Sequence, residues 1–210
     1  MDKTQNRIVL QYIKYVLKHK SQPVSVVSFV DDLKIKESTF LKYFNSFDHL
    51  ERTIWKSIFE DVRDSIQAED VYESYSVNEK LLAFYYSWIE TLKDYRSYAI
   101  YVAGKERFYE LYPSQFEDFK HAFEDFAKSL VEEGLATEEI ARRRFINDSY
   151  KHIAWAQPVS IFKFWIKDES DNFEDTDALI EKTVNFSFDL MRSNSIDSFF
   201  DLAKFHIQHF

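Results

Sequence analysis

Apolar residues recur along this 210-residue chain at the spacing of one face of an α-helix. The clearest case is a stripe with spacings of 3, 4, 3 and 4 residues: Phe116, Phe119, Phe123, Phe126 and Leu130. A second stripe has spacings of 4, 3 and 4: Trp55, Phe59, Val62 and Ile66. Side chains at such intervals lie on one side of a helix, and a wide apolar stripe is the side that faces a core. The pattern therefore predicts an all-α protein.

Polar breaks divide this pattern into about ten predicted helices. The first four cover residues 6–19, 25–33, 37–44 and 47–69, with Ser25 as an N-cap. Six later helices are predicted. One starts at Asn78, one runs from Tyr95 to about Tyr112, and one carries the phenylalanine stripe and ends at Gly134. The last three cover residues 137–167, residues 176–192 and the residues after Ser195. Pro158 is expected to kink the helix at 137–167. The acidic stretch at 168–175 is expected to be a poorly ordered loop.

Glycine and proline are scarce, and cysteine is absent. The chain has 2 Gly and 3 Pro, whereas an average chain of this length has about 25 of the two together. The phosphate loops of Rossmann and P-loop proteins need several glycines in a short segment, which Gly104 and Gly134 cannot supply. Without cysteine there are no disulfides, thiolate metal sites or thiol nucleophiles. These counts exclude most sheet-based nucleotide-binding classes.

The net charge of −9 is unevenly distributed along the chain. Residues 1–57 contain ten Lys and Arg against six Asp and Glu, a net charge of +4. Residues 58–210 contain 17 against 30, a net charge of −13. A short basic segment followed by a long acidic one indicates that the basic segment binds a polyanion. The polyanion would repel the acidic segment, and this repulsion would orient the basic segment toward the polyanion.

Residues Val24 to Leu50 carry a more specific pattern. The apolar pair Phe29-Val30 precedes a turn with Leu33 and Ile35, and the run Thr39-Phe40-Leu41-Lys42-Tyr43-Phe44 follows it. A polar turn then leads to Leu50. This segment resembles the DNA-binding signature of TetR (tetracycline-repressor-type) regulators. The basic head, the chain length and the helical layout extend the resemblance over the whole chain.

The resemblance implies a helix-turn-helix head whose third helix enters the major groove of DNA. The DNA-binding residues that it implies are Ser25, Lys36, Glu37, Ser38, Thr39, Lys42 and Tyr43. Phe40 and Phe44, four residues apart, are expected to hold this helix against the core. Lysine and hydroxyl side chains commonly bind DNA phosphates. Lys36 could also donate to guanine, and Glu37 could accept a hydrogen bond from the N4 amino group of cytosine.

Three positions depart from the family pattern. Leu33-Lys34 stands where the family has an Ala-Gly pair, so Lys34 falls in a turn that prefers positive φ. Leu41 stands where an aromatic residue often contacts phosphate, and Phe47 stands where a lysine usually opens the fourth helix. Two common phosphate contacts are therefore missing from the head.

Aromatic residues are concentrated between positions 84 and 112, which is typical of a pocket for a small apolar or aromatic molecule. The resemblance likewise implies an effector pocket in the body. The candidate lining residues are Tyr85, Trp88, Tyr101, Phe108, Phe123 and Trp155. Family members form dimers through their last long helices, which implies a homodimer through residues 139–167 and 176–192.

No pattern of catalytic or metal-binding residues stands out. Asp118 and His121 form one i, i+3 pair, whereas a di-iron bundle needs two Glu-x-x-His motifs. We therefore expect no enzymatic activity, no metal and no cofactor. The start of the chain is polar, and the longest nearly apolar stretch, residues 81–89, is too short to span a membrane. We expect a cytoplasmic protein with no membrane partner.

Two hypotheses follow. In the first, the protein is a transcriptional regulator, a repressor: residues 1–55 bind double-stranded operator DNA, and residues 56–210 bind a small apolar or aromatic effector and form a homodimer. In the alternative, the protein has the TetR fold without DNA binding and carries a lipid or isoprenoid-like ligand in its aromatic body.

Overall fold

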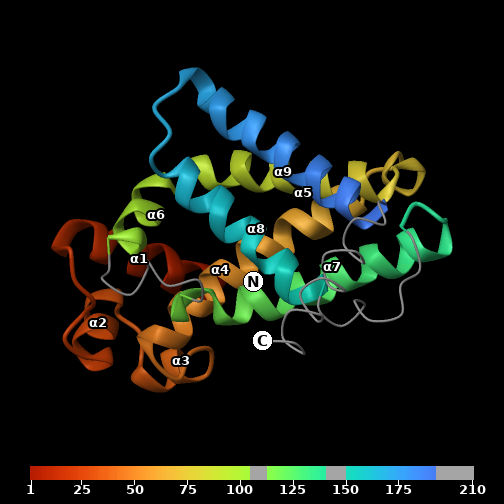
Figure 1. Ribbon diagram of the computed structural model, residues 1–210. Coiled ribbons are helices and arrows are strands. Elements are labelled where there is room, and N and C mark those ends of the chain that lie inside the picture. The colour runs from red at the N-terminus through yellow and green to blue at the C-terminus, as the bar shows by residue number, and fades with distance from the viewer. Residues whose placement is uncertain (105–112, 141–149, 193–210) are drawn as a thin grey trace, which may run out of the picture. The chain divides into compact units, whose positions relative to one another are not determined.

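The computed structural model describes residues 1–104, 113–140 and 150–192, and these are all-α, as predicted. The α-helices in them are α1 (Lys3–His19), α2 (Val26–Leu33), α3 (Glu37–Leu41), α4 (Phe47–Gln67), α5 (Val77–Lys93), α6 (Arg96–Ala103), α7 (Glu117–Ala136), α8 (Tyr150–Trp165) and α9 (Glu174–Arg192). Short 3₁₀ turns occur at η1 (Tyr72–Ser74), η3 (Ser114–Phe116) and η4 (Asp171–Phe173). Figure 1 shows these elements along the chain.

Two compact units make up the described residues. The first contains residues 1–65 and 88–123, and the second contains residues 66–87 and the described residues from 124 onward. The division predicted at residue 55, into a DNA-binding head and an effector-binding body, stays a prediction.

The first unit has an aromatic core. In the head, residues 1–55, helices α1, α2 and α3 surround the start of α4 (Figure 1). The ring centroid of Phe47 lies 5.5 Å from the ring centroids of Tyr12, Phe29 and Phe40. Farther along α4, the ring of Trp55 stacks on Tyr98 of α6 at 5.6 Å. The departure at Phe47 therefore has a structural reason, since its ring joins the core of the head.

The predicted phenylalanine stripe is confirmed, because all five of its residues are at most 5% exposed. Several predicted helix ends are wrong by a few residues. Helix α1 begins at Lys3, because the carboxylate of Asp2 accepts hydrogen bonds from the first-turn N–H groups of Thr4 and Gln5. The helix predicted at 37–44 ends at Leu41. Residues 105–112, 141–149 and 193–210, which include Phe108 and the predicted last helix, lie outside the described residues.

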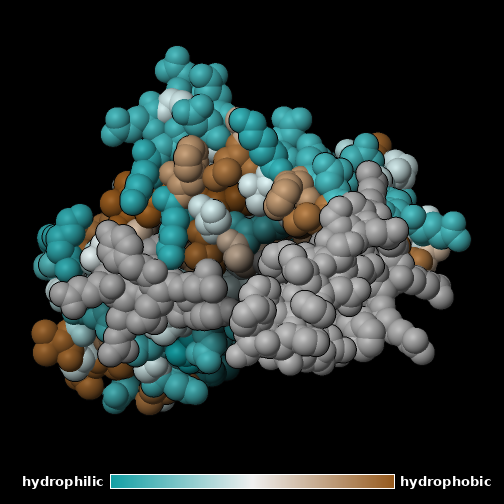
Figure 2. Space-filling view, viewed as in Figure 1, coloured by the Kyte–Doolittle hydropathy of each residue, from teal (hydrophilic) through white to brown (hydrophobic). Residues whose placement is uncertain are grey.

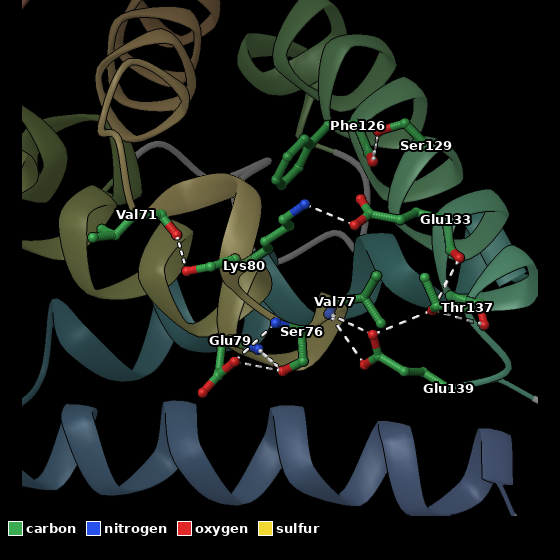
Figure 3. A network of polar contacts seen from close by, with 12 residues as sticks. Val71, Ser76, Val77, Glu79, Lys80, Phe126, Ser129, Glu133, Thr137 and Glu139 are labelled. Carbon is green, nitrogen blue, oxygen red and sulfur yellow. Dashed lines mark hydrogen bonds and ion pairs between the residues drawn. The ribbon is translucent and has the colours of Figure 1, made fainter.

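Polar contacts close one end of the second unit (Figure 3). Helix α5 begins with a capping box, in which Ser76 and Glu79 bond to each other's backbone N–H. Nζ of Lys80 donates to Glu133 of α7 at 2.7 Å, and Lys80 is only 3% exposed. The carboxylate of Glu139 accepts a bond from the N–H of Val77 at 3.2 Å. These contacts fix the start of α5 against the end of α7.

The prediction that Gly134 ends the phenylalanine-striped helix is wrong, because α7 continues to Ala136. The left-handed residue after this helix is Glu138, with φ of 63°. A Cβ atom at Gly134 would lie 2.7 Å from Cδ1 of Ile140 and 3.1 Å from Cγ2 of Val77. The glycine therefore permits close packing between α7 and its neighbours.

Candidate nucleic-acid interface

Helix α3 is held on the head by its apolar side. Phe40 and Phe44 are both 0% exposed, as predicted, and the ring of Phe40 meets Phe29 of α2 edge-on at 6.3 Å. Deeply buried rings of this size fix the orientation of a short helix. The opposite side of α3 is therefore the side presented to solvent.

The candidate base-reading residues lie on that solvent side. Lys36, Glu37, Ser38 and Lys42 are exposed, and Thr39 is half-buried. Lys36 is the N-cap of α3 and has an extended backbone conformation. The structure thus brings five of the seven residues predicted to face DNA onto α3 and its two cap positions.

The turn between α2 and α3 has the predicted left-handed residue. Lys34 has φ of 54° and ψ of 44°. Its N–H donates to the carbonyl of Asp31 at 3.0 Å, and the N–H of Ile35 donates to that of Val30 at 3.1 Å. These bonds satisfy carbonyl groups at the end of α2 and hold a conformation that costs a lysine energy.

Replacing Lys34 with glycine is expected to stabilise the protein by about 0.5–1 kcal/mol, because glycine adopts positive φ without the clash of a Cβ atom. The measurement is the free energy of unfolding in urea. Lys34→Ala is the matched control, since it removes the side chain but keeps the strain, and it should change stability little. A Lys34→Gly protein less stable than Lys34→Ala would contradict this account.

Ser25 and Tyr43 have structural partners in the head. Oγ of Ser25 accepts a hydrogen bond from the N–H of Ser28 at 3.1 Å, which makes Ser25 the N-cap of α2, as predicted. The hydroxyl of Tyr43 donates to Oδ2 of Asp2 at 2.7 Å. This bond with Asp2 also raises the pKa of Tyr43. Tyr43 therefore ties the start of α1 to the residues that follow α3.

Two residues that sequence reasoning did not single out, Asp2 and Arg7, help to position the head. Asp2 caps α1 with one carboxylate oxygen and holds Tyr43 with the other. Nη2 of Arg7 donates to the carbonyl of Leu33 at 2.8 Å, next to the turn at Lys34. A cation near the last carbonyls of a helix is favourable because of the helix dipole. The partners are 41 and 26 residues apart, so no local sequence signal pairs them.

The candidate pocket residues are divided between the two units. In the first unit, Trp88 and Phe123 are 0% exposed and both pack on the ring of Phe119, and Tyr101 is half-buried. In the second unit, Tyr85 and Trp155 are 0% exposed. Which of them line an effector pocket stays a prediction.

A partly buried chain of hydrogen bonds accompanies Tyr85 in the second unit. The hydroxyl of Tyr85 donates to Oε1 of Gln157 at 3.1 Å, and Nε2 of Gln157 donates to the hydroxyl of Ser187. Burial raises the pKa of Tyr85 well above its usual value. Sequence reasoning identified the ring but not Gln157, its hydrogen-bonding partner on α8.

Within the described ranges, no group of three or more histidines, cysteines, aspartates or glutamates could hold a metal ion. In the same ranges no helix is long and apolar enough to cross a membrane.

Comparison with known proteins identifies the family of this chain. A family model described as "Tetracyclin repressor-like, C-terminal domain" matches residues 80–206, more than half of the chain. The chain therefore belongs to the TetR family of regulators. A comparison with curated proteins gives no match.

Two solved structures share the fold at 14% sequence identity. A bacterial regulatory protein in the TetR family from Rhodococcus RHA1 matches with a TM-score of 0.54, over 91% of this chain and 98% of its own. A protein with unknown function from Rhodococcus sp. RHA1 matches with a TM-score of 0.58, over 92% of this chain and 97% of its own. At this identity the matches establish the shared fold alone.

Proposed function

We propose that this protein is a DNA-binding transcriptional regulator, a repressor, whose head reads an operator. The observation that carries the proposal is the exposed side of α3, where Lys36, Glu37, Ser38 and Lys42 face solvent while Phe40 is fully buried. This is the arrangement that presents side chains to base edges in the major groove. The net charge of +4 over residues 1–57 supports binding to a polyanion.

The aromatic residues of the head favour the regulator over a lipid carrier without DNA binding. A head that meets a lipid surface would expose aromatic side chains, yet each phenylalanine and tyrosine between positions 1 and 50 is buried or half-buried. Two of the three departures from the family pattern are also accommodated. Lys34 adopts the left-handed turn, and Phe47 packs in the core.

The proposal includes a homodimer and a small apolar or aromatic effector. Helices α8 and α9 carry exposed apolar side chains, with Phe164 42% and Phe186 62% exposed. Figure 2 shows apolar side chains among polar ones over these helices. A two-fold dimer through this side would present two heads and favour a palindromic operator. The effector would bind within the aromatic body, residues 56–210.

Selection of DNA from a random library with the purified protein, repeated at several salt concentrations, is expected to enrich a palindrome. Affinity should fall steeply with salt because phosphate contacts release counterions. Lys42→Ala should weaken binding to all sequences and reduce the salt slope by about 1, whereas Glu37→Ala should alter the preference at one base pair.

These two variants serve as controls for each other, because both remove one exposed charge, Glu37 from α3 and Lys42 from its C-cap. Failure to enrich any sequence at low salt would refute the regulator proposal. Equally small effects of both variants would refute the placement of α3 on DNA. Measuring binding of lipids and isoprenoids to the same preparation tests the alternative.

A further inference from the structure

A groove lies between α1 and α2 of the head. This α1–α2 groove has a volume of about 300 Å³, and the lining residues that matter here are Arg7, Lys14, Tyr15, Lys18 and His19 of α1 and Asp32 of α2. That volume is at the lower end of the range for small-molecule sites.

The groove is electropositive. Arg7, Lys14 and Lys18 contribute three positive charges, against one negative charge from Asp32. Lys14 and Lys18 are exposed, and within the described part of the chain neither takes part in an ion pair. Their charges are therefore not neutralised by the protein, and the groove attracts an anion.

Aromatic rings form the neighbouring wall. The imidazole of His19 lies against the ring of Tyr15, with centroids 4.3 Å apart and planes at 31°. Tyr15 in turn meets Phe29 of α2 edge-on at 6.2 Å, which fixes the ring in place. A preordered aromatic pair of this kind offers a surface on which a planar ligand can stack.

We propose that the α1–α2 groove binds a small aromatic anion. The anionic group, a phosphate or a carboxylate, lies near Lys14 and Lys18, and the planar ring packs against Tyr15 and His19. A spacing of four residues pairs Lys14 with Lys18 and Tyr15 with His19 along α1. Both pairs line the groove, so both parts of the ligand are within reach at once. The site does not depend on DNA binding by α3.

The test is calorimetric titration of the full-length protein with AMP and with salicylate, which carry a phosphate and a carboxylate. At least one should bind with a Kd below about 1 mM. Adenosine, which lacks the anion, and inorganic phosphate, which lacks the ring, should bind at least about tenfold more weakly than AMP if phosphate is the preferred group. Tighter binding of salicylate would identify a carboxylate as the preferred group.

The variant Lys14→Gln/Lys18→Gln should weaken binding of the preferred anion by about tenfold or more. The matched control is Lys3→Gln/Lys20→Gln, which makes the same charge change at the first residue and the C-cap of α1, outside the groove, and should stay within about twofold. Circular dichroism checks that both variants are folded.

Three results would overturn the proposal: no binding of either anion, equal losses in the two double variants, or phosphate binding as tightly as AMP when salicylate does not bind. Displacement of the bound anion by double-stranded DNA of random sequence would also overturn it, because the groove would then be part of a phosphate-backbone contact.

Discussion

Replacing Asp168 with alanine is expected to lower the free energy of unfolding by about 3 kcal/mol, because charge-assisted bonds are lost and a buried backbone donor is left unpaired. One carboxylate oxygen of Asp168 accepts from the N–H and hydroxyl of Ser170, at 2.8 and 2.6 Å. The other accepts from the N–H and hydroxyl of Thr176, at 2.9 and 2.5 Å. Asp168 is 6% exposed and Thr176 is 0% exposed. Urea unfolding measures the loss.

The matched control is Asp171→Ala, which removes an exposed carboxylate from the same loop. We expect this control to change stability by less than about 0.5 kcal/mol. If Asp168→Ala costs no more than the control, the carboxylate does not hold the loop between α8 and α9.

The same carboxylate should make stability depend on acid pH. Burial of Asp168 favours its neutral form, but the hydrogen bonds from Ser170 and Thr176 outweigh burial and lower the pKa from 3.8 to about 2. Because this pKa is lower in the folded state, the contribution of ionised Asp168 to the free energy of unfolding is present above about pH 4 and is lost as the pH falls toward 2. Asp168→Asn should show a flatter stability curve over this interval.

The second large effect is expected at Glu51, a buried acid that links α1 to α4. Glu51 is 2% exposed, and its Oε1 accepts a hydrogen bond from the hydroxyl of Tyr12 at 2.7 Å and one from Nε2 of Gln22 at 3.3 Å. Glu51→Ala leaves the buried hydroxyl of Tyr12 without its acceptor and opens a small void, so it should destabilise the protein by about 2–3 kcal/mol. Thermal and urea unfolding measure this loss.

Glu51→Gln is the conservative control, since its amide oxygen can still accept from Tyr12, and it should cost about 1 kcal/mol. Tyr12→Phe removes the donor, so it should make the Glu51→Ala change less costly in a double-mutant cycle. Additive losses in the cycle would show that the two side chains do not interact.

Alkaline pH gives an independent readout of this pair. Burial and the charge of Glu51 raise the pKa of Tyr12 far above its ordinary value of 10. Because this pKa is raised in the folded state, the contribution of the protonated Tyr12 hydroxyl to the free energy of unfolding is present below pH 10 and is lost as the pH rises above 10. Tyr12→Phe should therefore lose less stability above pH 10 than the unmodified protein does.

Much of the architecture could be predicted from local patterns. Phe40, Phe44 and the phenylalanine stripe are buried, as their spacing indicated, because helical periodicity decides which side chains share a face. Ser25 caps α2 because an N-cap acts within one turn of its own helix. The left-handed turn at Lys34 was implied by the family resemblance, because the family has a glycine at this position.

The acidic stretch 168–175 shows where local reasoning failed. A run of acids between two apolar patterns was expected to be a poorly ordered loop, yet Asp168 is buried and η4 forms within the stretch. The charge pattern could not indicate that one carboxylate would meet four donors. Gly134 is similar, because its neighbour Ile140 makes contact only once the chain has turned back on itself.

Periodicity and capping chemistry thus predicted most of the helices and their buried sides, and the family resemblance supplied the candidate residues of α3. These features depend on interactions within one or two helical turns. Only the tertiary structure paired Arg7 with Leu33, Asp2 with Tyr43 and Glu51 with Tyr12. It also joined unneutralised lysines to an aromatic wall in the α1–α2 groove. Such contacts join residues far apart in the chain, and their geometry arises only when helices pack.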